Sequence, residues 1–196
     1  ALNPFRDEAA AREARVVARP KVIGETEFAD EGLGDLTPYD CVFLCDVPRF
    51  TEAEAHRLAA HVRRGGGVVI SVGDQVDLAA YNDVLYRAGA GLLPARLVEK
   101  QADNADYTYQ LALESETERE PAFKPFTESR PREMLTKSAF HKFLRAEPAV
   151  KGGPRTLLSF ASSPLPGKDP DRVRAASPRG GAALIDKLAP RLSAIE

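Results

Sequence analysis

The sequence predicts an α/β fold built on a parallel sheet, and the stretch Tyr39–Asp74 carries most of that prediction. Two apolar runs, Cys41–Cys45 and Val68–Val72, show no alternation of polar and apolar residues, which is typical of strands covered on both faces. The amphipathic segment between them predicts a helix over Glu52–Arg64. A strand, a helix and a strand of this length imply a right-handed crossover between adjacent parallel strands.

The predicted helix has signals at both of its ends. Thr51 and Glu54 have the spacing of a capping box, in which each side chain binds the backbone N–H of the other residue. Gly65–Gly67 follow the last turn, where a residue with positive φ often ends a helix. Phosphate-binding glycines lie instead between a strand and the next helix, so this run does not predict a phosphate site.

Composition argues against several classes of function. The chain has 196 residues with 27 basic and 29 acidic side chains and a formal net charge of −2. This balance does not favour a nucleic-acid partner. No apolar run approaches the roughly 20 residues of a membrane helix, so we expect no direct membrane insertion by this segment. The sequence starts at Ala1 without a methionine, and we expect it to belong to a longer protein.

The two cysteines lie on the first predicted strand. Cys41 and Cys45 are four residues apart, so their Cα atoms are expected to be about 13 Å from each other. A disulfide needs less than about 7 Å. We therefore expect both side chains to be small buried hydrophobes, and replacing either with serine to cost about 1–3 kcal/mol of stability.

The rest of the chain predicts a less regular structure. We expect helices at Phe5–Arg15, Asp77–Ala88, Met134–Leu144 and Ala182–Ile195, strands at Arg15–Ile23, Tyr107–Leu113 and Arg155–Phe160, and loops at Glu114–Arg132 and Ser162–Gly181. From about Val98 the sequence is rich in charges and prolines and has too few apolar residues to form its own core. We therefore predict residues 1–97 as the α/β core and residues 98–196 as an elaboration of the same domain.

Four segments of the sequence carry a resemblance to a known family: YDCVFLCDVPRFTEAE, VRRGGGVV, YNDVLYRAG and GLLPARL. They resemble class I glutamine amidotransferase-like domains, of the kind found in bacterial membrane-anchored proteins that also carry a BatA-type region and a von Willebrand factor A domain. The likeness covers about Tyr39–Leu97. It implies a flavodoxin-like parallel sheet with helices on both faces and a functional edge at the C-terminal ends of the strands.

The resemblance also implies a Cys-His-Glu triad that this sequence lacks. Active members place a cysteine on the turn after the strand equivalent to Val68–Val72 and pair it with a His-x-Glu segment. Here Asp74 stands at about the position of the nucleophile, and none of His56, His61 and His141 begins a His-x-Glu. Thiol-based amide hydrolysis is therefore not expected. We expect a pseudoenzyme that carries no cofactor.

Several side chains are expected to gather at the C-terminal edge of the sheet and to line a groove for a ligand or a protein partner. They are Asp46, Arg49, Asp74, Gln75, Tyr81, Asn82, Arg87 and Arg96. Asp46 and Asp74 follow neighbouring strands, and together they are an alternative candidate for a magnesium site. Aspartates also cap turns and helix starts routinely, and we favour that role here.

Three functions are compatible with these observations. The first is a non-catalytic interaction or scaffolding domain that binds protein partners or flanking domains of a larger membrane-associated protein. The second is a metal-assisted hydrolase that uses Asp46 and Asp74. The third is a small-molecule sensor that uses the sheet edge. A receiver-type domain with Asp46 as phosphoacceptor is disfavoured, because no acidic pair follows a first strand. We favour the first function because the triad is missing.

Overall fold

The structure is a computed structural model in which the chain divides into two compact units, Ala1–Asp35 and Leu36–Glu196. The residues that it describes are 19–24, 26–28, 32–113, 117, 120–149, 154–171, 173 and 182–186. Among the described residues, all the strands and all the helices longer than one turn belong to the second unit. The helix predicted at Phe5–Arg15 lies outside the described residues. The strand predicted at Arg15–Ile23 is wrong where it can be checked, because residues 19–23 are described and form no strand.

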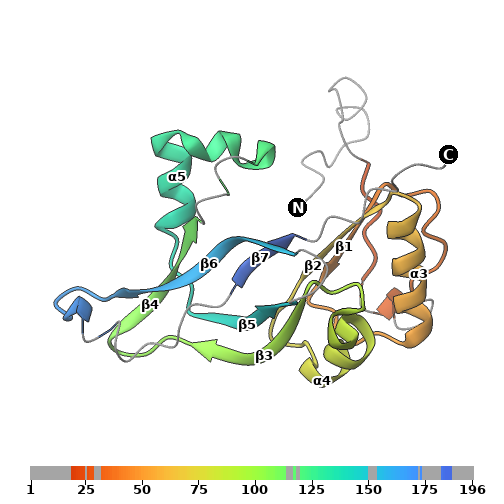
Figure 1. The fold of residues 1–196 in the computed structure, drawn as a ribbon, viewed down its shortest axis with the longest axis horizontal. Helices are drawn as coiled ribbons and strands as arrows, with labels where there is room; N and C mark the ends of the chain where they lie inside the picture. Colours follow the sequence, from red (N-terminus) through yellow and green to blue (C-terminus); the bar gives the residue numbers. More distant parts are fainter. Residues whose placement is uncertain are drawn as a thin grey trace. The chain divides into compact units, whose positions relative to one another are not determined.

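The predicted strand–helix–strand unit is present in the second unit (Figure 1). It consists of strand β1 (Cys41–Cys45), helix α3 (Glu52–Arg63) and strand β2 (Gly67–Ser71). The two strands pair in parallel, with Phe43 opposite Val69. The prediction of adjacent parallel strands joined by a helix is therefore confirmed.

The ends of α3 follow the predicted signals. The Glu54 N–H donates to Thr51 Oγ1 at 3.2 Å, and the Thr51 N–H donates to Glu54 Oε2 at 2.7 Å, so the capping box is complete. After the helix Gly65 has a φ of 95°, a conformation that glycine adopts without strain. Ala55 and Leu58 form the buried side of the helix.

The helix predicted at Asp77–Ala88 is present but changes its geometry along its length. Asp77 caps it as predicted, because Asp77 Oδ1 accepts from the N–H groups of Ala79 at 3.0 Å and Ala80 at 3.1 Å. Helix α4 spans only Leu78–Tyr81 and continues as a π-helical turn, Asn82–Tyr86, and a 3₁₀ turn, Arg87–Gly89. Arg87 and Ala88 have positive φ values, which end the regular helix.

The remaining strands are antiparallel and form two sheets (Figure 1). Strand β3 (Ala95–Ala102) pairs with β5 (Lys142–Pro148), so that Lys100 lies opposite Leu144. In the other sheet, β6 (Arg155–Pro164) lies between β4 (Tyr107–Leu113) and β7 (Ala182–Asp186). Strands β5 and β7 also contact each other.

Aromatic side chains build much of the core around these antiparallel strands. Tyr109 of β4 is fully buried and stacks edge-on against Phe143 of β5, with the ring centroids 4.7 Å apart. Phe143 also stacks on Phe160 of β6 at 4.2 Å. Such ring pairs stabilise beyond their buried area. A second buried cluster joins Phe123, on the 3₁₀ helix Pro121–Thr127, to Leu157 and Leu158 of β6, with Leu135 of helix α5 (Ser129–Thr136) packed against it.

The prediction of a flavodoxin-like parallel sheet with helices on both faces is wrong. The parallel sheet has only two strands, and the five remaining described strands pair antiparallel. The prediction extrapolated from one crossover to a whole sheet. From Ala95 onward the described strands instead pair antiparallel, β3 with β5 and β4 with β6, and antiparallel pairs need no crossover helix.

Four elements in the second half of the chain also differ from their predictions. Strand β3 was not expected at all, and the helix predicted at Met134–Leu144 ends at Thr136 and gives way to β5. The region predicted as a loop at Glu114–Arg132 contains the 3₁₀ helix and the start of α5. Residues Ala182–Asp186 form a strand beside β6, where a helix was expected. For β5 and β7, pairing with another strand overrides the local helix propensity.

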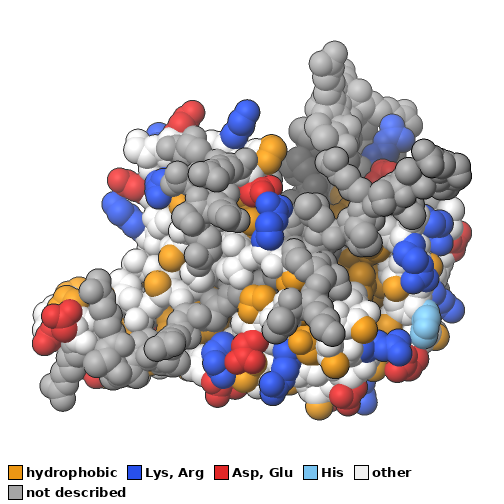
Figure 2. All heavy atoms as spheres, in the orientation of Figure 1, with side chains coloured by type: hydrophobic (Ala, Val, Ile, Leu, Met, Phe, Trp, Pro, Cys, Tyr) orange, Lys and Arg blue, Asp and Glu red, His pale blue; other side chains and the backbone are white. Residues whose placement is uncertain are grey.

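Acidic and basic side chains are interspersed over the visible face of the molecule (Figure 2). Among the described residues, no helix has the length and apolar character needed to cross a membrane.

Candidate functional site

Asp46 lies at the C-terminal end of β1 and holds the turn that follows β2. Its N–H donates to Ser71 O at 2.8 Å, and its Oδ1 accepts from the Gln75 N–H at 3.1 Å. Gly73 packs so closely that an added Cβ atom would lie 2.5 Å from Asp46 Cγ. Asp46 has a φ of 53°, a conformation that aspartate tolerates better than most residues. This carboxylate therefore acts as a turn-forming group between the two parallel strands.

Asp74 comes from the same turn but contacts the antiparallel strands. Its Oδ2 lies 3.6 Å from Lys142 Nζ on β5, and its backbone oxygen accepts from Lys100 Nζ on β3. The Asp74 and Lys142 side chains are both largely exposed, so this ion pair contributes little to stability. A lysine beside the carboxylate also competes with a cation for it. Within the described part of the chain, no group of three or more potential metal ligands converges.

Tyr81 and Asn82 use their polar groups to join elements of the fold. Tyr81 is buried, its hydroxyl donates to Val47 O at 2.6 Å, and its ring packs on Phe50. Asn82 Nδ2 donates to Leu97 O at 2.8 Å, while Asn82 Oδ1 accepts from the Leu97 N–H at 2.9 Å. These contacts attach the helical segment to the end of β1 and to β3. Both residues thus have structural roles.

The three predicted arginines do not converge on one site. Arg87 lies 3.9 Å from Glu52 on α3, and Arg96 lies 3.9 Å from Glu147 on β5. Arg49 is exposed and has no ion pair among the described residues. The structure therefore brings Asp46, Gln75 and Tyr81 together around the end of β1. It places the arginines on separate ion pairs or in solvent.

Burial of two tyrosines predicts a loss of stability in alkali. Burial raises the pKa of Tyr81 well above its ordinary value, and the nearby Asp46 charge adds to this. Burial likewise raises the pKa of Tyr109, with a further contribution from its hydrogen bond to Tyr107. Below about pH 10 both phenols are neutral in the folded and unfolded states, so they add no pH dependence. Above about pH 10 only the unfolded state ionises, and the free energy of unfolding should fall.

This alkaline effect is measurable by urea unfolding at pH 8 and near pH 11. We expect a decrease of roughly 1 kcal/mol per pH unit for each phenol above about pH 10. Tyr81→Phe should lower stability at pH 8, because the bond to Val47 O is lost, but should also flatten the pH dependence. An unchanged alkaline slope in this variant would contradict the assignment.

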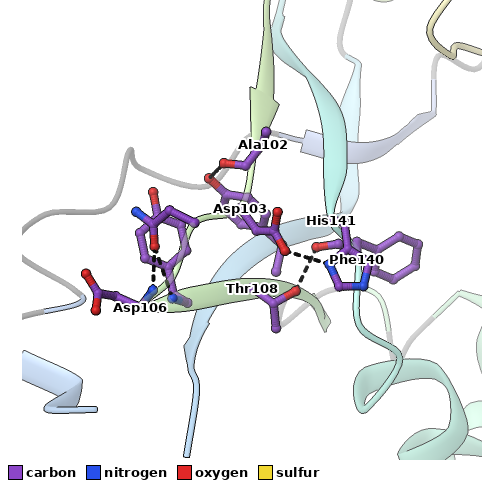
Figure 3. A network of polar contacts seen from close by, with 9 residues as sticks. Ala102, Asp103, Asp106, Thr108, Phe140 and His141 are labelled. Atoms are coloured by element: carbon purple, nitrogen blue, oxygen red, sulfur yellow. Dashed lines mark hydrogen bonds and ion pairs between the residues drawn. The ribbon is translucent and has the colours of Figure 1, made fainter.

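A histidine–carboxylate pair lies at the junction of the antiparallel sheets (Figure 3). His141 Nδ1 is 2.5 Å from Asp103 Oδ2, where Asp103 follows β3 and His141 precedes β5. The Asp103 N–H donates to His141 O at 2.8 Å, which fixes the two backbones. Nearby, Thr108 Oγ1 on β4 donates to Phe140 O at 2.9 Å. Sequence reasoning missed this pair, because only strand pairing brings two residues so far apart in the chain together.

The pair resembles the base and orienting acid of a hydrolase, but no hydroxyl or thiol of the described residues is hydrogen-bonded to His141. A working arrangement needs a hydroxyl or thiol within hydrogen-bond reach of the histidine. The Thr108 hydroxyl is turned to a backbone carbonyl instead. His56 binds the Glu52 carbonyl through Nδ1, and no described hydrogen bond joins a histidine to Cys41 or Cys45.

The cysteines differ from their prediction. Cys41 and Cys45 are both exposed, whereas the apolar run around them predicted burial on both faces. On β1 only Leu44 is buried, and Cys41, Phe43 and Cys45 share the opposite, exposed face. Substitution by serine should therefore change stability by no more than about 0.5 kcal/mol, which replaces the larger cost expected from the sequence.

Comparisons with known protein families, with curated proteins and with solved structures find no match for this chain.

Proposed function

We propose that this chain is a non-catalytic interaction domain of a larger membrane-associated protein, and that it binds a protein segment on the exposed face of the β1–β2 sheet. The membrane association follows from the family resemblance alone. The interaction role is supported by one observation above the others, which is the open apolar face of this sheet.

The exposed face consists of alternate residues on the two parallel strands. Phe43 is 49% exposed and lies opposite Val69, which is 42% exposed. Cys41 and Cys45 flank Phe43 on the same face. Leu44 points the other way and is buried. Parallel sheets are normally covered on both faces, and clustered exposed apolar side chains mark interaction sites.

The polar edge of the sheet supports a non-catalytic role. Asp46 is occupied by the Gln75 N–H, and Asp74 lies beside Lys142. His141 is bonded to Asp103, and no nucleophile among the described residues is bonded to it. These groups hold turns and strand ends together, and none of them favours the metal-assisted hydrolase over the interaction domain.

Maleimide labelling of Cys41 and Cys45 tests this proposal in the full-length protein and in this chain alone. We expect both thiols to react in the isolated chain and to react at least about tenfold more slowly in the full-length protein. Phe43→Ser should remove this protection, because it deletes the central apolar contact, with little effect on stability. Met134→Ser is the matched control, since Met134 is 71% exposed on α5, outside this face.

Two results would contradict the proposal. Equal labelling rates in the two proteins would mean that the face is not an interface. Release of ammonia from glutamine that disappears in Cys41→Ser or Cys45→Ser would mean that the domain is catalytic.

A further inference from the structure

A small polar pocket lies at the other end of the parallel sheet, where β1 and β2 begin. It has a volume of about 220 Å³. The lining residues come from the segment before β1 and from the end of α3: Thr37, Tyr39, Asp40, His61, Arg64, Gly65 and Gly66. It is separate from the groups at the C-terminal edge of the sheet.

His61 gives this pocket a polar group with no protein partner. Its side chain is 3% exposed, and Nε2 has no hydrogen-bond partner within the described part of the chain. Buried side-chain nitrogens are hydrogen-bonded in the large majority of cases. We therefore expect a bound molecule to form a hydrogen bond with His61 Nε2. Gly66 packs directly on the imidazole, because an added Cβ atom would lie 2.2 Å from Nε2. The ring is therefore fixed in place by the backbone after α3.

The pocket also carries one charge of each sign. Asp40 and Arg64 are exposed side chains in its lining, and neither forms an ion pair among the described residues. The Gly67 N–H donates to Asp40 O at 2.8 Å and the Arg64 N–H donates to Ala60 O at 3.1 Å, so both backbones are anchored. A ligand with a single charge would satisfy one of these groups and be repelled by the other. A ligand with one charge of each sign would pair with both Asp40 and Arg64.

We propose that this pocket binds a small zwitterion that carries an ammonium and a carboxylate group. Asp40 accepts from the ammonium, the Arg64 guanidinium holds the carboxylate, and His61 Nε2 provides a hydrogen bond inside the pocket. A guanidinium binds a carboxylate through two parallel hydrogen bonds, which gives orientation as well as affinity. At Gly65 no atom lies within 4 Å of the position of an added Cβ, so a ligand can approach the backbone closely there.

Titration with glycine, β-alanine and γ-aminobutyrate tests the proposal, because these probes fit the volume and differ in the separation of their charges. Binding is followed by amide chemical shifts in NMR spectra of the whole chain. We expect saturable binding of at least one probe in the millimolar range, with shifts at Asp40 and Gly65–Gly67. Acetate and methylammonium, each with one of the two charges, should bind at least about tenfold more weakly.

Two exposed substitutions separate binding from folding. Arg64→Gln and Asp40→Asn should each weaken binding by about tenfold or more, because each removes one charge-assisted contact. Arg63→Gln and Asp83→Asn are the matched controls on exposed residues outside the pocket, and they should leave affinity unchanged. Absence of saturable binding for all three probes would overturn the proposal. Equal binding of the zwitterions and the singly charged probes, or equal effects of the pocket and control substitutions, would also overturn it.

Discussion

Leu58→Ala should destabilise the domain by about 2–5 kcal/mol, one of the largest effects expected for any single substitution in this chain. Leu58 is 0% exposed and lies on the buried side of α3. Helix α3 contacts both β2 and the π-helical turn Asn82–Tyr86, in which Leu85 is also fully buried. Removal of the isobutyl group loses its transfer free energy and leaves a cavity between these elements.

Urea unfolding followed by circular dichroism measures this loss. Arg57→Ala is the matched control, because Arg57 precedes Leu58 on the same helix and is exposed. The control should change the free energy of unfolding by no more than about 0.5 kcal/mol. If both variants had the same midpoint, α3 would not be packed as described, and the β1–β2 sheet would have no covered face.

The part of the fold that the sequence predicts correctly is the part encoded by local signals. The Thr51–Glu54 capping box, the Asp77 cap and the apolar strands β1 and β2 all depend on residues close together in the chain. A single crossover also determines the parallel direction of the two strands. These local signals do not indicate whether further parallel strands follow. In the described part of the chain, no third strand joins β1 and β2.

The antiparallel part depends on pairings between distant residues. In the β3–β5 and β4–β6 pairings, even the paired residues that are nearest in sequence, Ala102 with Lys142 and Leu113 with Leu158, are 40 and 45 residues apart. Strand β3 carries several charged residues that show no strand pattern by themselves. Local propensity therefore favoured helices where tertiary pairing produces strands.

The candidate site shows the same division. Asp46 and Gln75 meet because parallel strands end at one edge, which the sequence predicts. Lys100 and Lys142 reach Asp74 only because β3 and β5 pair, and the same pairing brings Asp103 to His141. The exposed cysteines have a related cause. An apolar run predicts burial on both faces only when both faces are covered, and the covering elements lie elsewhere in the sequence.

Gly91→Ala should destabilise the domain by about 2–4 kcal/mol, although the substitution adds only a methyl group. An added Cβ atom would lie 1.9 Å from Leu85 O and 2.7 Å from Leu85 C, and both are backbone atoms at the end of the helical segment. The same carbonyl accepts the Leu93 N–H at 2.9 Å, just before β3 begins. The methyl group therefore cannot be accommodated by a side-chain rotation, and the backbone must move.

The displaced backbone leads into β3, so the effect should extend beyond the turn. We expect amide exchange to increase at Leu93 and along β3, and contact between Lys100 and Asp74 to weaken, in addition to a lower midpoint of urea unfolding. Gly24→Ala is the matched control, because an added Cβ atom there meets nothing within 4 Å. In that variant the free energy of unfolding should change by no more than about 0.5 kcal/mol. If Gly91→Ala and Gly24→Ala had the same urea midpoint, the prediction would be wrong. The chain would then not make the close turn onto Leu85 that places β3 beside Asn82.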